Sequence, residues 1–187
     1  MFLLVLLVCM TFSARIQAGH GLAPALGLSR IHSTDGDRVA LLSPGLNYTA
    51  DFRIRGIHFV LSATTVIPLW ATQNGKRYTN PQFYNFYMGT DLFLGISRDY
   101  HIQDRFLLSP ALGWHQNGIL MRGKPRYLDF YSLTSGLGLH VLATDCRQSR
   151  ILNFLFLSMG LDFLDYLYEE NKLRFGLSLC LGVGHRF

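Results

Sequence analysis

The sequence predicts an all-β protein: an eight-stranded antiparallel transmembrane β-barrel that follows an N-terminal signal peptide. The chain has 187 residues, of which 49% are hydrophobic and only 16% are charged, whereas typical soluble domains are about 25% charged. Its longest apolar run, residues 1–12, is shorter than the roughly 20 residues that cross a bilayer as a helix. Apolar and polar residues alternate along most of the remaining chain, as in strands that separate two environments. Apolar composition without transmembrane helices favours a membrane barrel.

The N-terminal segment has the pattern of a secretory signal peptide. An apolar block at residues 2–12 is followed by a short segment that ends at Ala18, and cleavage after Ala18 places Ile16 and Ala18 at the two recognition positions. We therefore divide the chain into a signal peptide (1–18) and a barrel domain (19–187). No Lys or Arg precedes the block, so a buried N-terminal helix is the alternative; a lipid anchor on Cys9 is disfavoured because small residues do not precede it.

Eight segments carry the alternation of a strand. They are residues 23–32, 46–55, 57–64, 84–96, 106–115, 131–141, 151–163 and 173–184. An even number of strands suits a closed antiparallel barrel. Residues 151–164 also fit a buried helix, but the agreement among the other segments argues against that alternative.

The connections divide into two sets if the N-terminus is periplasmic. The external set is predicted at residues 33–42, 71–81, 116–125 and 166–172, and the opposite set at residues 55–56, 98–104 and 143–149. Asn74-Gly75 is a turn signal within the external set. The three lysines, Lys76, Lys124 and Lys172, all fall in the external set, which supports this division.

The two faces of the strands differ in composition. One face is rich in Leu and Phe, which suits contact with lipid. The other is rich in Gly, Ser and Thr, which suits the narrow interior of an eight-stranded barrel. A soluble barrel would need a charged outer coat, yet Lys and Glu together number only five. The predicted lumen-lining residues are Asn47, Asp51, Arg53, Asp91, His115, His140, Asp162 and Arg174.

The cysteines and histidines predict neither a disulfide nor a metal site. Removal of the signal peptide leaves Cys146 in a turn and Cys180 in mid-strand, on the order of 15–20 Å apart by strand rise. That separation is too long for a disulfide. No Cys-x-x-Cys motif or paired histidine spacing is present, and we expect no cofactor.

The carboxy-terminal strand ends in Phe187 and carries apolar residues on one face, with His185 two positions before the end. This resembles the assembly signal of bacterial outer-membrane barrel proteins, although the usual signal has Tyr or an apolar residue at the position of His185. The whole mature chain is similar in architecture to small outer-membrane barrels of the OmpA-domain, OmpX and OmpW type. The resemblance implies an outer-membrane location, with outer-membrane lipid, periplasmic chaperones and the barrel-assembly machinery as partners.

Our first functional hypothesis is a narrow pore or conduit for small hydrophobic solutes, as the OmpW-like resemblance implies. The glycine-rich inner face is expected to leave space. Against this hypothesis, eight strands enclose almost no lumen, and inward charges can pair and seal it. Asp162 and Arg174 are expected to form such a pair across neighbouring strands.

The second hypothesis is a surface structural, adhesion or ligand-binding protein with a plugged lumen. Its predicted contact points are the basic external residues Lys76, Arg77, Arg122, Lys124 and Arg126. These residues suit anionic ligands such as lipopolysaccharide phosphates, anionic lipid or acidic polymers. Nucleic acid is not expected.

The third hypothesis, a lipid A-modifying acyl hydrolase or transferase, has the least support. One deacylase family carries His-x-Ser-Asn on a strand, and the nearest segment here, His115-Gln116-Asn117, lacks the serine. His58, His140 and His185 have no evident nucleophile and acid nearby in the sequence. We therefore predict that the protein is not an enzyme.

Overall fold

The computed structural model describes residues 18–33, 38–54, 57–67, 69–74, 76–79, 84–102, 105–123, 130–146, 152–166 and 173–187. The predicted signal peptide lies outside these ranges except for Ala18, so the predicted domain boundary stays a prediction. Within the described ranges there is no helix that is long and apolar enough to cross a membrane.

Eight long strands of the described chain form the wall of a barrel. They are β1 (Ala18–Ser33), β2 (Arg38–Ile54), β3 (Ile57–Val66), β6 (Tyr84–Ser97), β8 (Phe106–Gly123), β9 (Phe130–Asp145), β10 (Phe154–Asp165) and β11 (Leu173–Arg186). Three short strands extend this wall. They are β4 (Trp70–Gln73), β5 (Lys76–Thr79) and β7 (Tyr100–Ile102).

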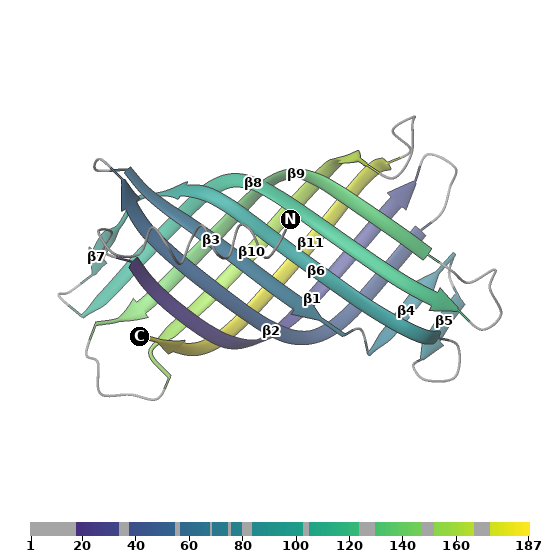
Figure 1. Ribbon diagram of the computed structural model, residues 1–187, viewed down its shortest axis with the longest axis horizontal. Coiled ribbons are helices and arrows are strands. Elements are labelled where there is room, and N and C mark those ends of the chain that lie inside the picture. Colours follow the sequence, from purple (N-terminus) through teal and green to yellow (C-terminus); the bar gives the residue numbers. More distant parts are fainter. Residues whose placement is uncertain are drawn as a thin grey trace.

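The barrel is closed and antiparallel throughout. Each wall strand pairs with its sequence neighbours, and β1 pairs with both β2 and β11. Leu28, for example, lies opposite Leu42 on one side and Leu179 on the other. The strands are strongly tilted (Figure 1). We call the end where β1 begins and β11 finishes the terminal end, and the end with β4 and β5 the loop end.

Closure at the terminal end includes the last residue of the chain. The backbone N–H of Phe187 donates to the carbonyl of His20 at 2.9 Å, and the N–H of His20 donates to the carbonyl of Phe187 at 3.2 Å. The ring of Phe187 also stacks on that of His20, with 6.4 Å between their centroids. The predicted assembly residue therefore lies in the seam that joins the two ends of the sheet; its part in assembly stays a prediction.

Two predicted external connections overlap with strands of the wall. β2 already begins at Arg38, so residues 38–42 belong to the wall, and β8 continues to Gly123 rather than ending near residue 116. The reason is that the interior becomes apolar near the loop end: Val39, Leu41 and Ile119 point inward and are buried. Apolar residues on both faces hide the alternation that marks a strand.

The predicted loop at residues 71–81 also contains regular structure. β4 pairs with β2 beyond the end of β3, and β5 pairs with β4. Asn74 turns between them with a φ of 52°, in the left-handed region that Asn tolerates better than most residues. The turn signal at this position is confirmed, and the hairpin lengthens the wall at the loop end. At the opposite end, β7 occupies part of the connection predicted at residues 98–104 and pairs with β8.

The outer surface is apolar, as predicted. Large hydrophobic side chains are exposed on every wall strand whose side chains are described, among them Leu22, Leu46, Ile57, Leu94, Leu112, Leu137, Leu155 and Leu181. Polar side chains alternate with them and are buried inside, including Ser43, Asn47, Thr64, Ser132 and Thr134. This polar-in, apolar-out arrangement is that of a transmembrane barrel.

Candidate functional site: the closed lumen

Most of the predicted lumen residues are buried inside the barrel. These are Asn47, Asp51, Asp91, His115, His140 and Asp162. Arg53 differs, because its side chain is 56% exposed at the terminal end. Arg53 lies on the inner face of β2, but it is next to the last residue of that strand, where the lumen meets solvent. Arg174 belongs to β11, but its side chain lies outside the described part of the structure.

A histidine held between two carboxylates lies at the middle of the lumen. His115 Nδ1 lies 2.7 Å from Asp162 Oδ1, and His115 Nε2 lies 2.9 Å from Asp91 Oδ2. Because a carboxylate only accepts hydrogen bonds, an imidazolium with a proton on each nitrogen satisfies both partners at once. Thr134 Oγ1 donates to the other oxygen of Asp162 at 2.7 Å. These residues come from β8, β6, β10 and β9 and tie four strands together.

The predicted Asp162–Arg174 ion pair cannot be assigned, since the Arg174 side chain is not described. The contacts of Asp162 go to Thr134 on the neighbouring strand β9 and to His115 on β8, one strand further along the wall. Sequence reasoning missed this histidine–carboxylate cluster. Asp91 and Asp162 were recognised as inward charges, but the residue that joins them is 24 positions from one and 47 from the other.

An aromatic layer fills the barrel on the terminal side of His115. The ring of His140 stacks between those of Phe93 and Phe156, with centroid distances of 5.3 Å and 5.7 Å. All three side chains are fully buried. Among the described residues, neither ring nitrogen of His140 has a hydrogen-bond partner. The layer therefore closes the lumen with three stacked rings.

The inner glycines accommodate these rings and do not leave open space, which corrects the expectation drawn from composition. A Cβ on Gly95 would lie 2.4 Å from Phe93 Cζ, and one on Gly160 would lie 2.3 Å from His115 Cε1. A Cβ on Gly182 would lie 2.5 Å from Phe156 Cε1. Gly95 thus faces a ring of its own strand, and Gly160 and Gly182 face rings that belong to other strands. The small residues allow the barrel to be filled.

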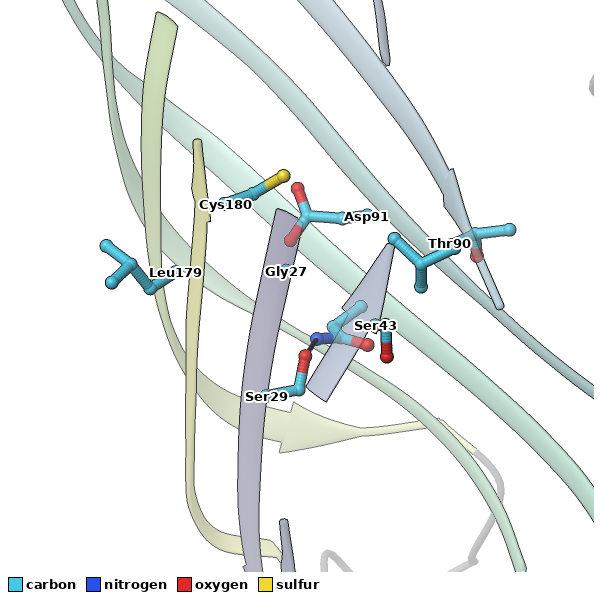
Figure 2. Close-up of a pocket in the computed structure, with 9 residues that line it drawn as sticks. Gly27, Ser29, Ser43, Thr90, Asp91, Leu179 and Cys180 are labelled. Atoms are coloured by element: carbon cyan, nitrogen blue, oxygen red, sulfur yellow. Dashed lines mark hydrogen bonds between the residues drawn. The ribbon is translucent and has the colours of Figure 1, made fainter. Parts of the chain in front are cut away.

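One small cavity lies in the part of the lumen that the structure describes. A cavity of about 20 Å³ lies on the loop side of His115, lined by residues that include Ser43, Asp91 and Cys180. Figure 2 shows the Asp91 carboxylate facing the thiol of Cys180. At the same cavity, Asn117 Nδ2 donates a hydrogen bond to Ser29 Oγ at 3.1 Å. Such a cavity holds about one water molecule. It is too small for a solute to pass.

A second charged cluster closes the terminal end. His58 lies between Asp51 and Asp99, with Nε2 3.1 Å from the first carboxylate and Nδ1 3.0 Å from the second. Arg186 donates to Asp51 at 2.6 Å and to Thr144 at 3.0 Å. Arg53 pairs with Asp99. Two guanidinium groups therefore accompany the two carboxylates at this end.

Asp99 lies in the turn after β6, outside the spanning part of the wall. Burial alone would raise its pKa. Hydrogen bonds from Ser109, at 2.6 Å, and from Arg53, together with the charges of His58 and Arg53, outweigh burial and lower the pKa of Asp99 below its ordinary value of 3.8. Asp99 is therefore an ionised partner at the terminal end.

Three lumen residues have the contacts of a Ser-His-Asp triad. Ser178 Oγ lies 3.0 Å from His115 Nε2, and His115 Nδ1 contacts Asp162. A general base, however, needs an unprotonated Nε2, and in this site Asp91 accepts a hydrogen bond from that nitrogen. Ser178 is itself buried. These contacts join side chains from β6, β8, β10 and β11 inside the lumen.

The cysteines lie in different surroundings. Cys146 is exposed, Cys180 is buried in the lumen, and both are free. Within the described ranges, no group of His, Cys, Asp and Glu is arranged to hold a metal ion.

The predicted basic contact points lie at the loop end as far as the backbone is described. Lys76 and Arg77 belong to β5, and Arg122 belongs to β8. Their side chains, and Lys124 and Arg126 altogether, lie outside the described part of the structure. The anionic ligand predicted for them stays a prediction.

Comparisons with known proteins agree with this architecture. No protein-family model matches the chain, and no curated protein matches its sequence. Among solved structures, the chain is similar to Neisserial surface protein A, with 15% identity, a TM-score of 0.53, and coverage of 90% of this chain and 97% of that protein. It also matches Ail, the attachment invasion locus protein of Yersinia pestis, with 9% identity, a TM-score of 0.46, and coverage of 91% and 99%. Ail in complex with the heparin analogue sucrose octasulfate matches at 10% identity and a TM-score of 0.44, with coverage of 91% and 99%. The closed antiparallel barrel and its likeness to Neisserial surface protein A give the chain the fold of the small eight-stranded outer-membrane β-barrel proteins.

Proposed function

We propose that this protein is an outer-membrane barrel with a closed lumen, and that it acts through its surface as a structural, adhesion or ligand-binding protein. The observation that carries the proposal is the filled interior. The stacked rings of Phe93, His140 and Phe156 and the Asp91–His115–Asp162 cluster occupy successive levels of the lumen. A conduit needs a continuous path, and the cavity beside the cluster holds about one water molecule.

The outer-membrane location is part of this proposal. Its support is the apolar belt on a closed barrel, since closure satisfies every backbone hydrogen bond within the bilayer. The signal-peptide pattern of residues 1–18 supports export as part of the proposal.

The proposal is tested by conductance in planar bilayers. We expect refolded wild-type protein to produce no discrete channels. We expect the double variant Phe93→Ala/Phe156→Ala to conduct, because it removes two rings of the stack and leaves water-sized space around His140. Leu94→Ala/Leu155→Ala is the matched control, since these neighbours in the sequence point outward and are exposed. It should stay silent. Reproducible channels from the wild-type protein would overturn the proposal and support the conduit hypothesis instead.

The same proposal holds that the protein has no hydrolytic activity. Its support is the double engagement of His115, whose two nitrogens both face carboxylates. A fluorophosphonate probe, which labels serine nucleophiles activated by a base, should leave Ser178 unmodified in the refolded protein. Labelling that disappears in Ser178→Ala would instead establish a serine hydrolase.

A further inference from the structure

A groove runs across the strands on the outer face of the barrel. Its volume is about 570 Å³, and its walls are two rows of outward side chains. Cross-strand pairing aligns Arg30, Leu177 and Leu161 in one row, and Leu28, Leu179 and Met159 in the other. Between the rows, Ser178 and Gly160 present no side chain to the outside, because Ser178 turns inward to His115. The sheet backbone therefore forms the floor.

The groove extends over five adjacent strands, from β1 through β11, β10 and β9 to β8. Four strand spacings correspond to about 19 Å. Its walls and floor are otherwise apolar or small. A groove of this length suits one extended hydrocarbon chain.

Arg30 is the charged residue of the groove and lies at its β1 edge. The side chain is exposed, and its Nε–H donates to His32 Nε2 at 2.9 Å. The His32 ring stacks on Phe175 with 4.4 Å between centroids, which holds the guanidinium in place. Among the described residues, no carboxylate lies within ion-pairing distance of Arg30. A fixed cation beside an apolar groove calls for a ligand with an anionic head and an apolar chain.

We propose that this groove binds one anionic phosphorylated lipid, with an acyl chain between the two rows and the phosphate on Arg30. Guanidinium groups bind phosphate oxygens through paired charge-assisted hydrogen bonds. The acyl chain covers the exposed leucines of both rows, and burial of apolar area stabilises the bound state. The site is distinct from the lumen and lies on the other side of the same strands.

The experiment compares lipids that share acyl chains and a phosphate but have different head groups, one net anionic and one zwitterionic. Refolded protein in detergent is incubated with equal amounts of dipalmitoyl phosphatidylglycerol and dipalmitoyl phosphatidylcholine, and retained lipid is counted by native mass spectrometry. We expect one phosphatidylglycerol per chain in preference to phosphatidylcholine. Arg30→Gln should reduce that retention about tenfold or more, since hydrogen bonds to charged groups contribute at least one such factor.

Two further variants separate the groove from the general apolar surface. Leu161→Trp should fill the groove and reduce retention of both lipids, whereas Leu94→Trp changes an equally exposed leucine outside the groove and should have no effect. Arg98→Gln removes an exposed arginine that lies over Tyr100 instead, and it should bind as the wild type does. Retention that is equal for the two lipids, or that is unchanged in Arg30→Gln, would overturn the proposal. Loss of a protein dimer in Leu161→Trp, with no lipid retained by the wild type, would assign the groove to a second copy of the chain and also overturn it.

Discussion

The side chain of His115 is fully buried and contacts the carboxylates of Asp91 and Asp162. The three residues come from three different strands, β8, β6 and β10. Removal of one partner from such a buried ionic cluster leaves a charge unpaired, which costs about 3–5 kcal/mol. A shift in the pairing register of β6, β8 or β10 would also separate His115 from a carboxylate and leave a buried charge unpaired. The cluster therefore does more than fill space, because it selects one register among neighbouring strands.

A methyl group at Gly160 should destabilise the barrel. A Cβ there would lie 2.3 Å from two atoms of the His115 ring, which the two carboxylates hold in place. We expect Gly160→Ala to lower the free energy of unfolding by about 1–3 kcal/mol, the usual cost of overpacking. Urea unfolding in lipid vesicles measures this change.

Gly27→Ala is the matched control for that substitution. Gly27 also faces the lumen, but its Cβ would meet no atom closer than 3.6 Å, an ordinary contact distance. Its stability should stay within about 0.5 kcal/mol of the wild type. Equal stabilities for the two variants would show that His115 moves freely, contrary to the geometry.

Asp99 should make the terminal end sensitive to acid. Its pKa is lower in the folded protein than its ordinary value of 3.8, so the ionised carboxylate stabilises the native state. This stabilisation is fully present above the ordinary value and is lost as the pH falls through the lower, folded value. Ser109→Ala removes a hydrogen bond to the carboxylate and should move that loss to higher pH.

Carboxyl NMR in micelles, with unfolding measured between about pH 2 and pH 5, checks this shift. Asp99→Asn carries no charge at this position, and its stability should depend less on pH over that interval. A titration of Asp99 that is unchanged in Ser109→Ala would contradict the assigned cause.

Among the elements, the β4–β5 hairpin lies outside the closed ring of strands. β4 pairs with β2 above the end of β3, while β5 pairs with β4. The chain passes from β3 to β4 without losing contact with β2, since Ile67 and Leu69 donate to the carbonyls of Pro44 and Leu42 at 2.9 Å and 2.8 Å. The hairpin thus continues one wall of the barrel, and its stability should be separable from that of the ring.

Substitutions at Asn74 should test that separation. Its side chain accepts a hydrogen bond from the Arg38 N–H at 2.9 Å, and its positive φ is unfavourable for a β-branched residue. Asn74→Gly keeps the backbone conformation but loses the hydrogen bond, and Asn74→Val loses both. We expect hydrogen exchange in β4 and β5 to become faster from wild type to Asn74→Gly to Asn74→Val. The corresponding free energy of opening should fall by about 1–3 kcal/mol in total. Exchange in β9 and β10 should stay constant, and a parallel increase there would show that the hairpin and the ring unfold together.

For the whole molecule, the sequence was informative wherever the two faces of a strand differ in polarity. β11 shows this, because its outward leucines alternate with inward glycine, serine and cysteine from Leu177 to Gly182. The even strand number, the closure and the apolar outer belt followed from such segments. The prediction was wrong at the beginning of β2 and the end of β8, where inward Val39, Leu41 and Ile119 make the interior apolar.

The sequence by itself determined that the chain forms an apolar-coated barrel with small and polar residues inside, because period-two alternation depends only on neighbouring residues. The tertiary structure decided what those inner residues do. His115 meets Asp91, Asp162 and Ser178, and Gly160 accommodates the His115 ring, only because the stagger between strands brings these positions to one level. That stagger is a property of the closed sheet. The alternation of apolar and polar residues along a strand does not encode the stagger between strands. For this reason the glycine-rich inner face suggested an open lumen, whereas in the structure the rings of other residues occupy the space beside these glycines.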